Sequence, residues 1–140
     1  MASLKATGAG FADLAAKFDR LADRYPRLAA EKGAAAAQKC IDREYANEAG
    51  PDGTKWKQKK RPNGKPQGQA SGETMASAKA IPGPNADILL SVEGAASYLQ
   101  NGTSRMDARQ ILPEGKLDPE WAEPIDDAAH DAIHEAYEGR

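Results

Sequence analysis

The residues with the clearest chemical spacing are two histidines near the C-terminus, His130 and His134. On a helix, a spacing of four places two imidazoles on one face, where both can bind the same metal ion. A zinc site needs a third or fourth ligand. The chain has no other histidine, and its one cysteine, Cys40, is far away in sequence. Because acidic neighbours such as Asp131 are common on exposed helices, we predict a solvated polar face and no metal site.

Other groups that could support catalysis are no better arranged. Asp126 and Asp127 could perform acid–base chemistry if burial separated their pKa values, but they lie among charged neighbours. Cys40 lies beside Ile41 in a predicted helix, where a buried and inert thiol is the default. The chain has no G-x-S-x-G motif, and its glycines lack the spacing of a phosphate-binding loop. We therefore predict no catalytic residues, no cofactor and no enzymatic activity.

The segment with the highest density of positive charge is a basic run in the middle of the chain. It holds six cations, one tryptophan and no acid: Lys55, Trp56, Lys57, Lys59, Lys60, Arg61 and Lys65. An aromatic residue among cations is typical of single-strand nucleic-acid binding. The alternatives are a solvated arm, or an arm that becomes ordered on the acidic surface of a partner. Trp56 has its own alternative, as a core residue that anchors the base of the loop.

Composition favours a small single domain that associates with other chains. The 140 residues carry a net charge of −2 and are 40% hydrophobic but only 6% aromatic, with many alanines. Alanine buries little area, so we expect a thin core that a partner chain completes. The stretch 114–140 has nine acids and two bases, and it could pair with the basic run of a neighbouring copy. One cysteine suits a reducing cytosol, and no apolar run approaches the ~20 residues of a membrane span.

Helices are predicted at both ends of the chain. In the first, apolar residues recur every three or four positions, and Pro26 predicts either two helices, at about 10–24 and 27–47, or one kinked helix. Near the C-terminus, 118–138 reads as a helix with Asp118 as its N-cap and Pro119 at its first position. Pro124 then favours a later start, near Glu123. We expect its apolar face to comprise Trp121, Ile125, Ala129, Ala132, Ile133 and Ala136.

The middle of the chain is predicted to hold a long loop and a small sheet. Eight prolines and glycines make 50–72 a flexible basic loop. The turn Pro82–Asn85 joins a strand at 86–92 to a partner strand at 74–81. Residues 95–99 could form a third strand or a short helical turn, and 110–112 could return to the sheet. The order indicates one α+β domain over 1–140, with an N-terminal helical region, a small antiparallel sheet and a C-terminal helix.

Three short signals combine a turn with a large or charged anchor. They are Gly50-Pro51-Asp52-Gly53-Thr54-Lys55-Trp56, Tyr98-Leu99-Gln100-Asn101-Gly102-Thr103 and Ala108-Arg109-Gln110-Ile111-Leu112-Pro113. In this order, with Ser71-Gly72 between the first two, they resemble the tail-completion and virion-morphogenesis proteins of tailed bacteriophages, including the group named for phage Mu. The resemblance covers about 10–138. The chain departs from it at Asp107, where the family often has proline, at Met75, where leucine is usual, and in its longer, more basic loop.

The resemblance implies a structural protein at the phage head–tail junction, which caps or completes the tail and helps to join it to the head. Such proteins work as homo-oligomeric rings of roughly sixfold symmetry around the DNA channel. The implied partners are other copies, tail tube or terminator proteins, head connector proteins and phage DNA, in the virion and in the host cytoplasm during assembly. The interface candidates are Asp52, Gly53, Tyr98, Gln100, Gly102, Arg109 and Pro113. For Arg109 we expect an ion pair with a neighbouring subunit or connector, or else one within the subunit.

Overall fold

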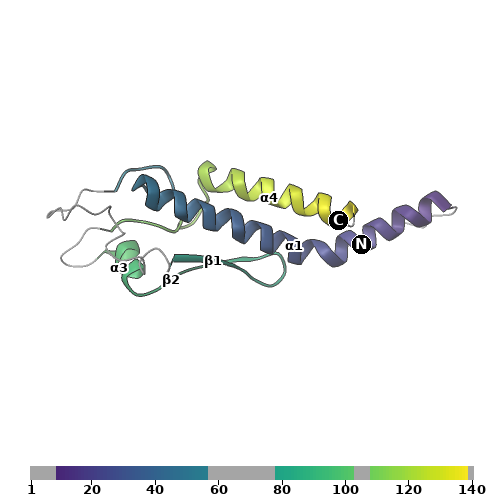
Figure 1. Ribbon diagram of the computed structural model, residues 1–140, viewed down its shortest axis with the longest axis horizontal. Coiled ribbons are helices and arrows are strands. Elements are labelled where there is room, and N and C mark those ends of the chain that lie inside the picture. The colour runs from purple at the N-terminus through teal and green to yellow at the C-terminus, as the bar shows by residue number, and fades with distance from the viewer. Residues whose placement is uncertain (1–8, 57–77, 103–107, 139–140) are drawn as a thin grey trace.

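The computed structural model describes residues 9–56, 78–102 and 108–138. It shows the predicted α+β arrangement, with a long N-terminal helix, a two-stranded antiparallel sheet and a C-terminal helix. The elements are α1 (Ala9–Asn47), β1 (Ala78–Pro82), β2 (Ile88–Val92), α3 (Ala95–Asn101) and α4 (Pro119–Glu138). Figure 1 shows α1 as the central layer, with α4 along one side and the hairpin along the other. No helix in these ranges combines the length and apolar character that a bilayer crossing needs.

The N-terminal region is one continuous helix, so the prediction of two helices is wrong. Pro26 lies inside α1, and Figure 1 shows that the helix changes direction toward its N-terminus, in keeping with the kinked alternative. A proline inside a helix costs about 3 kcal/mol or more. The residues directly after it offset part of this cost, because Leu28 and Ala29 are buried against Ala132 and Ala136 of α4.

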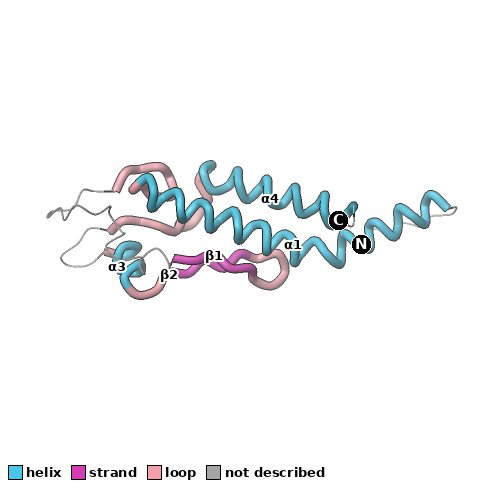
Figure 2. Tube along the Cα trace, in the orientation of Figure 1, coloured by secondary structure: helices cyan, strands magenta, loops and turns pink. Residues whose placement is uncertain are grey.

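The predicted hairpin is present, but its turn lies at 83–87, so Pro82 ends β1 and β2 begins at Ile88 instead of at 86. β1 and β2 pair antiparallel, with Ala78 opposite Val92 and Pro82 opposite Ile88 (Figure 2). Residues 74–77 of the predicted first strand lie outside the described part of the chain. One sheet face packs on α1 at Gly33, where an added Cβ would lie 2.6 Å from Ile88 Cδ1. The glycine that weakens the helix locally is therefore what lets the hairpin approach it.

Residues 95–101 form the short helix α3, which agrees with the helical alternative and not with a third strand. The predicted return of 110–112 to the sheet is wrong, because the sheet of the described chain has only two strands. The backbone N–H groups of Ile111 and Leu112 instead donate to the side-chain oxygen of Gln100, at 2.7 and 2.8 Å. A side chain thus takes the place of a neighbouring strand.

The C-terminal helix starts at Pro119, as the N-cap signal predicts, and the later start near Glu123 is wrong. The carbonyl of Asp118 accepts hydrogen bonds from the backbone N–H groups of Trp121 and Ala122. Pro124 lies inside α4 and cannot donate to the carbonyl of Glu120. That carbonyl instead accepts a hydrogen bond from Arg43 Nη2 on α1, at 3.1 Å. The packing of two helices therefore restores the partner that the proline removes.

The core falls into two clusters along α1. The larger lies at one end and is built from the biggest buried side chains, including Ile41, Tyr45, Trp56, Ile111 and Trp121. The smaller, farther along α1, joins Leu28 and Ala29 to two alanines of α4. The expected apolar face of α4 is correct for Trp121, Ala132 and Ala136. It is wrong for Ile133, which is 43% exposed.

Candidate functional site

The three signals of the sequence meet at one end of the molecule, which we call the motif end: residues 50–56, α3 with Gly102, and residues 108–113. The indole of Trp56 joins the first signal to the third, because its Nε1 donates to the carbonyl of Gln110 at 3.0 Å. The same ring packs edge-on against Tyr45 of α1, with 5.7 Å between ring centroids. One side chain therefore connects segments that are about fifty residues apart in the chain.

The first signal is a tight turn closed by its own hydrogen bonds. The backbone N–H of Gly50 donates to the carbonyl of Thr54 at 2.9 Å, and that of Gly53 donates to the carbonyl of Gly50 at 3.0 Å. Asp52 Oδ1 accepts from the backbone N–H of Thr54 at 2.9 Å, and this bond lowers the pKa of Asp52. Gly53 has φ 85°, and an added Cβ would meet the carboxylate of Glu120 at 2.8 Å. Asp52 and Gly53 are thus needed to form the turn, whatever else they contact.

The second signal holds the third through the amide of Gln100. Its Oε1 accepts from two backbone N–H groups, and its Nε2 donates to the carbonyl of Leu112 at 3.1 Å and to Glu114 Oε1 at 3.3 Å. Gly102 ends α3 with φ 73°, and its N–H donates to the carbonyl of Tyr98 at 2.8 Å. Gln100 and Gly102 are therefore parts of an internal clamp.

The remaining predicted interface residues divide between interior and surface. Arg109 is only 7% exposed, so its side chain lies mostly inside the subunit, in keeping with the alternative of a contact within the subunit. Trp56 is 5% exposed, which corrects its place among the partner-facing residues and agrees with the core alternative. Pro113 is half-buried. Tyr98 is 60% exposed, more than any other large apolar side chain that the structure describes at the motif end.

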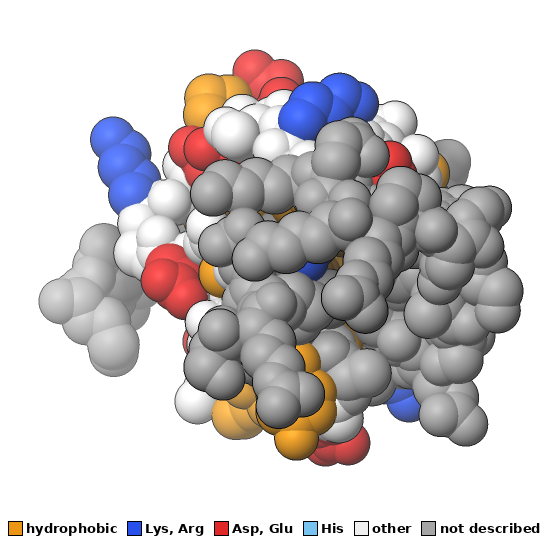
Figure 3. All heavy atoms as spheres, turned by 90° about the vertical axis from the view of Figure 1, so that its left-hand side faces the viewer, with side chains coloured by type: hydrophobic (Ala, Val, Ile, Leu, Met, Phe, Trp, Pro, Cys, Tyr) orange, Lys and Arg blue, Asp and Glu red, His pale blue; other side chains and the backbone are white. Residues whose placement is uncertain are grey.

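The basic run is described only at its start. Lys55 is exposed, and its Nζ donates to the carbonyl of Asn47 at 2.8 Å. Lys57, Lys59, Lys60, Arg61 and Lys65 lie outside the described residues. Figure 3 views the molecule from this end, and its coloured atoms include basic, acidic and hydrophobic side chains. The role of the run in binding nucleic acid or protein stays a prediction.

Glu44, which lies beside this end, is a buried acid that was not predicted from the sequence. It is 2% exposed, its Oε1 accepts from Trp121 Nε1 at 2.8 Å, and its Oε2 has no hydrogen-bond partner among the described residues. Burial raises the pKa of Glu44 to about 8, against a smaller opposing effect of the Trp121 hydrogen bond. Its spacing from Ala37 and Ile41 was the available signal, because seven and three positions keep a residue on the same helix face.

An open hollow of about 380 Å³ lies next to Glu44. It is lined by Arg43, Glu44, Asn47, Ala49, Gly50, Gly53, Lys55 and Glu120. Its charged groups are of both signs, and Arg43 Nη2 lies 4.0 Å from Glu120 Oε2. Cys40 is buried nearby and burial raises the pKa of its thiol, which is the opposite of what an attacking thiolate needs. The described residues that line the hollow include no serine, threonine, cysteine or histidine.

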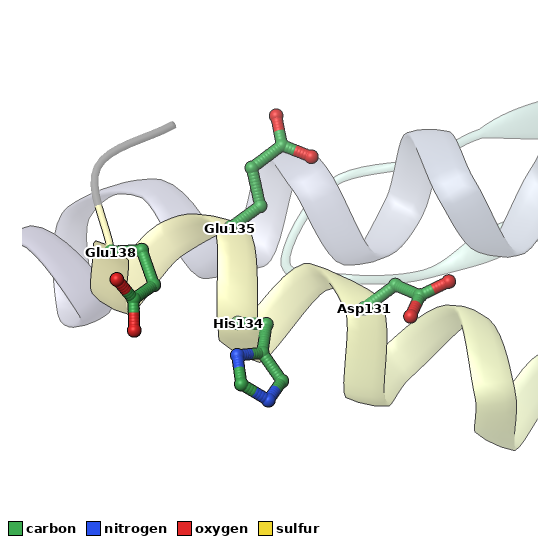
Figure 4. Close-up of a pocket in the computed structure, with 4 residues that line it drawn as sticks. All are labelled: Asp131, His134, Glu135 and Glu138. Atoms are coloured by element: carbon green, nitrogen blue, oxygen red, sulfur yellow. The ribbon is translucent and has the colours of Figure 1, made fainter.

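The histidines of α4 do not form part of a metal cluster in the described chain. No group of three or more histidine, cysteine, aspartate or glutamate side chains there could hold an ion. Figure 4 shows Asp131, His134, Glu135 and Glu138 spreading from a single helix without converging. Glu135 is instead paired with Lys32 of α1 at 2.9 Å, which lowers the pKa of the acid and raises that of the amine.

Comparison of the chain with models of protein families, with curated protein sequences and with solved structures finds no match.

Proposed function

We propose that this chain is a structural protein of the neck of a tailed-phage virion, which completes or caps the tail and helps to join it to the head. The supporting observation is the interlocking of the three signals, whose order resembles that family. Trp56 of the first signal donates a hydrogen bond to the third, and Gln100 of the second signal accepts one from the third. Their shared role gives a physical reason for the three to occur together, since each would lose its partner without the others.

The described surface also suits a building block that works beside other chains. Within 9–56, 78–102 and 108–138, seven large hydrophobic side chains are exposed: Phe11, Phe18, Ile81, Leu89, Tyr98, Leu117 and Ile133. The buried set is rich in alanine, so one copy gains little from its own helix packing. In this proposal the neighbouring copies form a ring of roughly six, and tail terminator or head connector proteins cover the remaining apolar side chains. Localisation in the virion, and in the host cytoplasm during assembly, follows from the same proposal.

The decisive experiment inactivates the coding sequence in the phage that carries it and supplies the protein in trans. We expect full heads and free tails to accumulate unjoined, and joined virions to return with the complete chain. Electron microscopy of the lysate distinguishes unjoined heads and tails from joined virions. Normal yields of joined, infectious virions without the protein would overturn the proposal.

A surface variant tests whether the motif end is the surface that joins tail to head. Tyr98→Ser removes an exposed side chain at the motif end, so we expect an unchanged Tm and reduced joining. His130→Ser removes an exposed ring from the distant half of α4, outside the exposed apolar set, and serves as the matched control. Equal joining by the two variants would show that the motif end is not the joining surface.

Nucleic-acid binding through Lys55–Lys65 stays the alternative, and loss of DNA affinity in the Lys59→Ala, Lys60→Ala, Arg61→Ala triple variant would support it.

A further inference from the structure

The two edges of the hairpin differ in how their backbone groups are used. In an antiparallel pair, residues alternate between those bonded to the partner strand and those whose N–H and C=O groups point away. The N–H of Gly83 donates to the carbonyl of Asp87 at 2.8 Å, and the register pairs Ile81 with Leu89 two residues farther on. The alternation therefore turns the backbone groups of Ile88, Leu90 and Val92 away from β1.

The outer edge of β1 is closed. The side chain of Gln38 on α1 donates from Nε2 to the carbonyl of Ala78 at 3.3 Å and accepts at Oε1 from the N–H of Ala80 at 2.9 Å. Pro82, the last residue of the strand, has no N–H to offer. No incoming strand can pair with β1 without displacing Gln38.

The outer edge of β2 has no such cover in the described part of the chain. No residue there supplies a hydrogen bond to the outward backbone groups of Ile88, Leu90 and Val92. The strand Ile88–Val92 also contains no charge, no proline and no glycine, which are the residues that usually protect an edge. On its outer face, Leu89 is 48% exposed and lies opposite Ile81, which is 47% exposed.

We propose that two copies of this chain pair through β2, antiparallel and centred on Leu90, to form a four-stranded sheet. In this register Leu90 faces Leu90 of the partner subunit, and Ile88 faces Val92 of the partner subunit. All outward groups of both strands are then paired at once. The inward faces of the two hairpins join into one apolar surface. On the outer face, Leu89 lies opposite Ser91 of the partner subunit.

A second copy fits this edge because β2 is complementary to itself. A two-fold axis through Leu90 satisfies both strands with one register, and the five residues Ile88–Val92 carry no charge. Like charges meet just beyond the ends of the strand, where Asp87 lies opposite Glu93 of the partner subunit. A head-to-tail alternative, β2 against β1 of the next copy, is opposed by Gln38. The pairing depends on the hairpin edge and not on the neck assignment. A ring built from such pairs would hold an even number of subunits.

Paired charges on the outer face test this register. The variant with Leu89→Glu and Ser91→Glu places like charges opposite each other at two positions of the dimer. The matched variant with Leu89→Lys and Ser91→Glu places opposite charges there. Both keep the inward face and the backbone, and in both Ser91→Glu lies opposite Lys79 of its own hairpin. We expect roughly tenfold weaker dimerisation of the first variant than of the second.

Light scattering over a concentration series measures dimerisation of the full chain, and circular dichroism verifies that each variant is folded. A wild-type chain that doubles in mass, with loss in the like-charge variant and retention in the matched variant, supports the pairing. A wild type that stays monomeric shows that a second copy does not occupy the edge and overturns the proposal. Equal dimerisation of the two variants overturns the register. If the monomeric variant still joins heads to tails normally, the neck proposal stands and β2 pairing is shown not to be needed for it.

Discussion

At the scale of single residues, Glu44 makes stability depend on pH. Its pKa is about 8 in the folded protein and near 4.5 in the unfolded chain. Between these values the folded state keeps a proton that the unfolded state has lost, so the contribution of Glu44 to stability is largest below pH 4.5 and falls as pH rises toward 8. The slope approaches about 1.4 kcal/mol per pH unit.

We predict that Glu44→Gln removes this slope, because the amide is neutral at every pH and can still accept from Trp121 Nε1. At pH 8.5 the variant should be more stable than the wild type by about 2–4 kcal/mol, with a much smaller difference at pH 5. Urea unfolding at the two pH values measures this. Glu123→Gln, an exposed site on α4, is the control and should keep the wild-type slope. A wild type with equal stability at both pH values would show that folding does not raise the pKa of Glu44.

Gln100 provides the second prediction at this scale. Gln100→Ala leaves the N–H groups of Ile111 and Leu112 without their acceptor, and Ile111 is fully buried. We expect a loss of about 2–3 kcal/mol in the free energy of unfolding. Gln110→Ala is the matched control, since its side chain is exposed and bonds only to the carbonyl of Leu112; it should cost less than about 0.5 kcal/mol. Similar losses in both variants would show that the clamp contributes little.

At the scale of elements, the contact between α1 and the hairpin depends on Gly33. A Cβ there would lie 2.6 Å from Ile88 Cδ1 and 3.2 Å from Ile88 Cγ1, and the two methyl groups of valine reach farther. We predict that Gly33→Val destabilises the protein by about 1–3 kcal/mol. Gly10→Val is the control, because nothing lies within 4 Å of that position, and it should be nearly neutral. Adding Ile88→Ala to Gly33→Val should recover part of the loss in a double-mutant cycle. Equal effects of the two valine substitutions would contradict the close approach.

Elements whose evidence lies within a few neighbouring residues could be predicted from the sequence. The turn after Pro82, the strand that follows it and the start of α4 at Pro119 all depend on local backbone chemistry. The errors at Pro26 and Pro124 came from the same local rule. It counts the hydrogen bond that proline removes but not the replacement from another helix, such as Arg43 at the carbonyl of Glu120.

The motif end was predictable in its parts but not in its connections. The turns at Gly53 and Gly102 were evident, and Trp56 was recognised as a possible core residue. Nothing in the sequence pairs Trp56 with the carbonyl of Gln110, or Gln100 with Ile111, because these bonds join segments far apart in the chain. Glu44 was missed for a related reason. Its burial depends on Trp121, which lies 77 residues away.

At the scale of the whole molecule, the two ends of the core differ in what they bury. The motif end encloses two tryptophans and a tyrosine, and each aromatic side chain removes about 150–250 Å² from water. The other cluster joins Leu28 and Ala29 to alanines of α4, which bury far less. Beyond it, Phe11 and Phe18 are each half exposed. Stability should therefore decline along α1 from residue 47 toward residue 9.

Hydrogen exchange measured by mass spectrometry tests this gradient in the dilute chain. We predict that amides of residues 38–46 of α1 and 121–128 of α4 exchange slowest, and that those of 9–22 exchange at least tenfold faster, because local opening there exposes little apolar surface. Helix ends fray in any case, so the informative comparison is the second and third turns of α1, which lie inside the helix but outside both core clusters. If the chain is a building block, protection of 9–22 should rise at concentrations where it assembles. Uniform protection along α1 in the dilute monomer would show that a single copy already completes its own core.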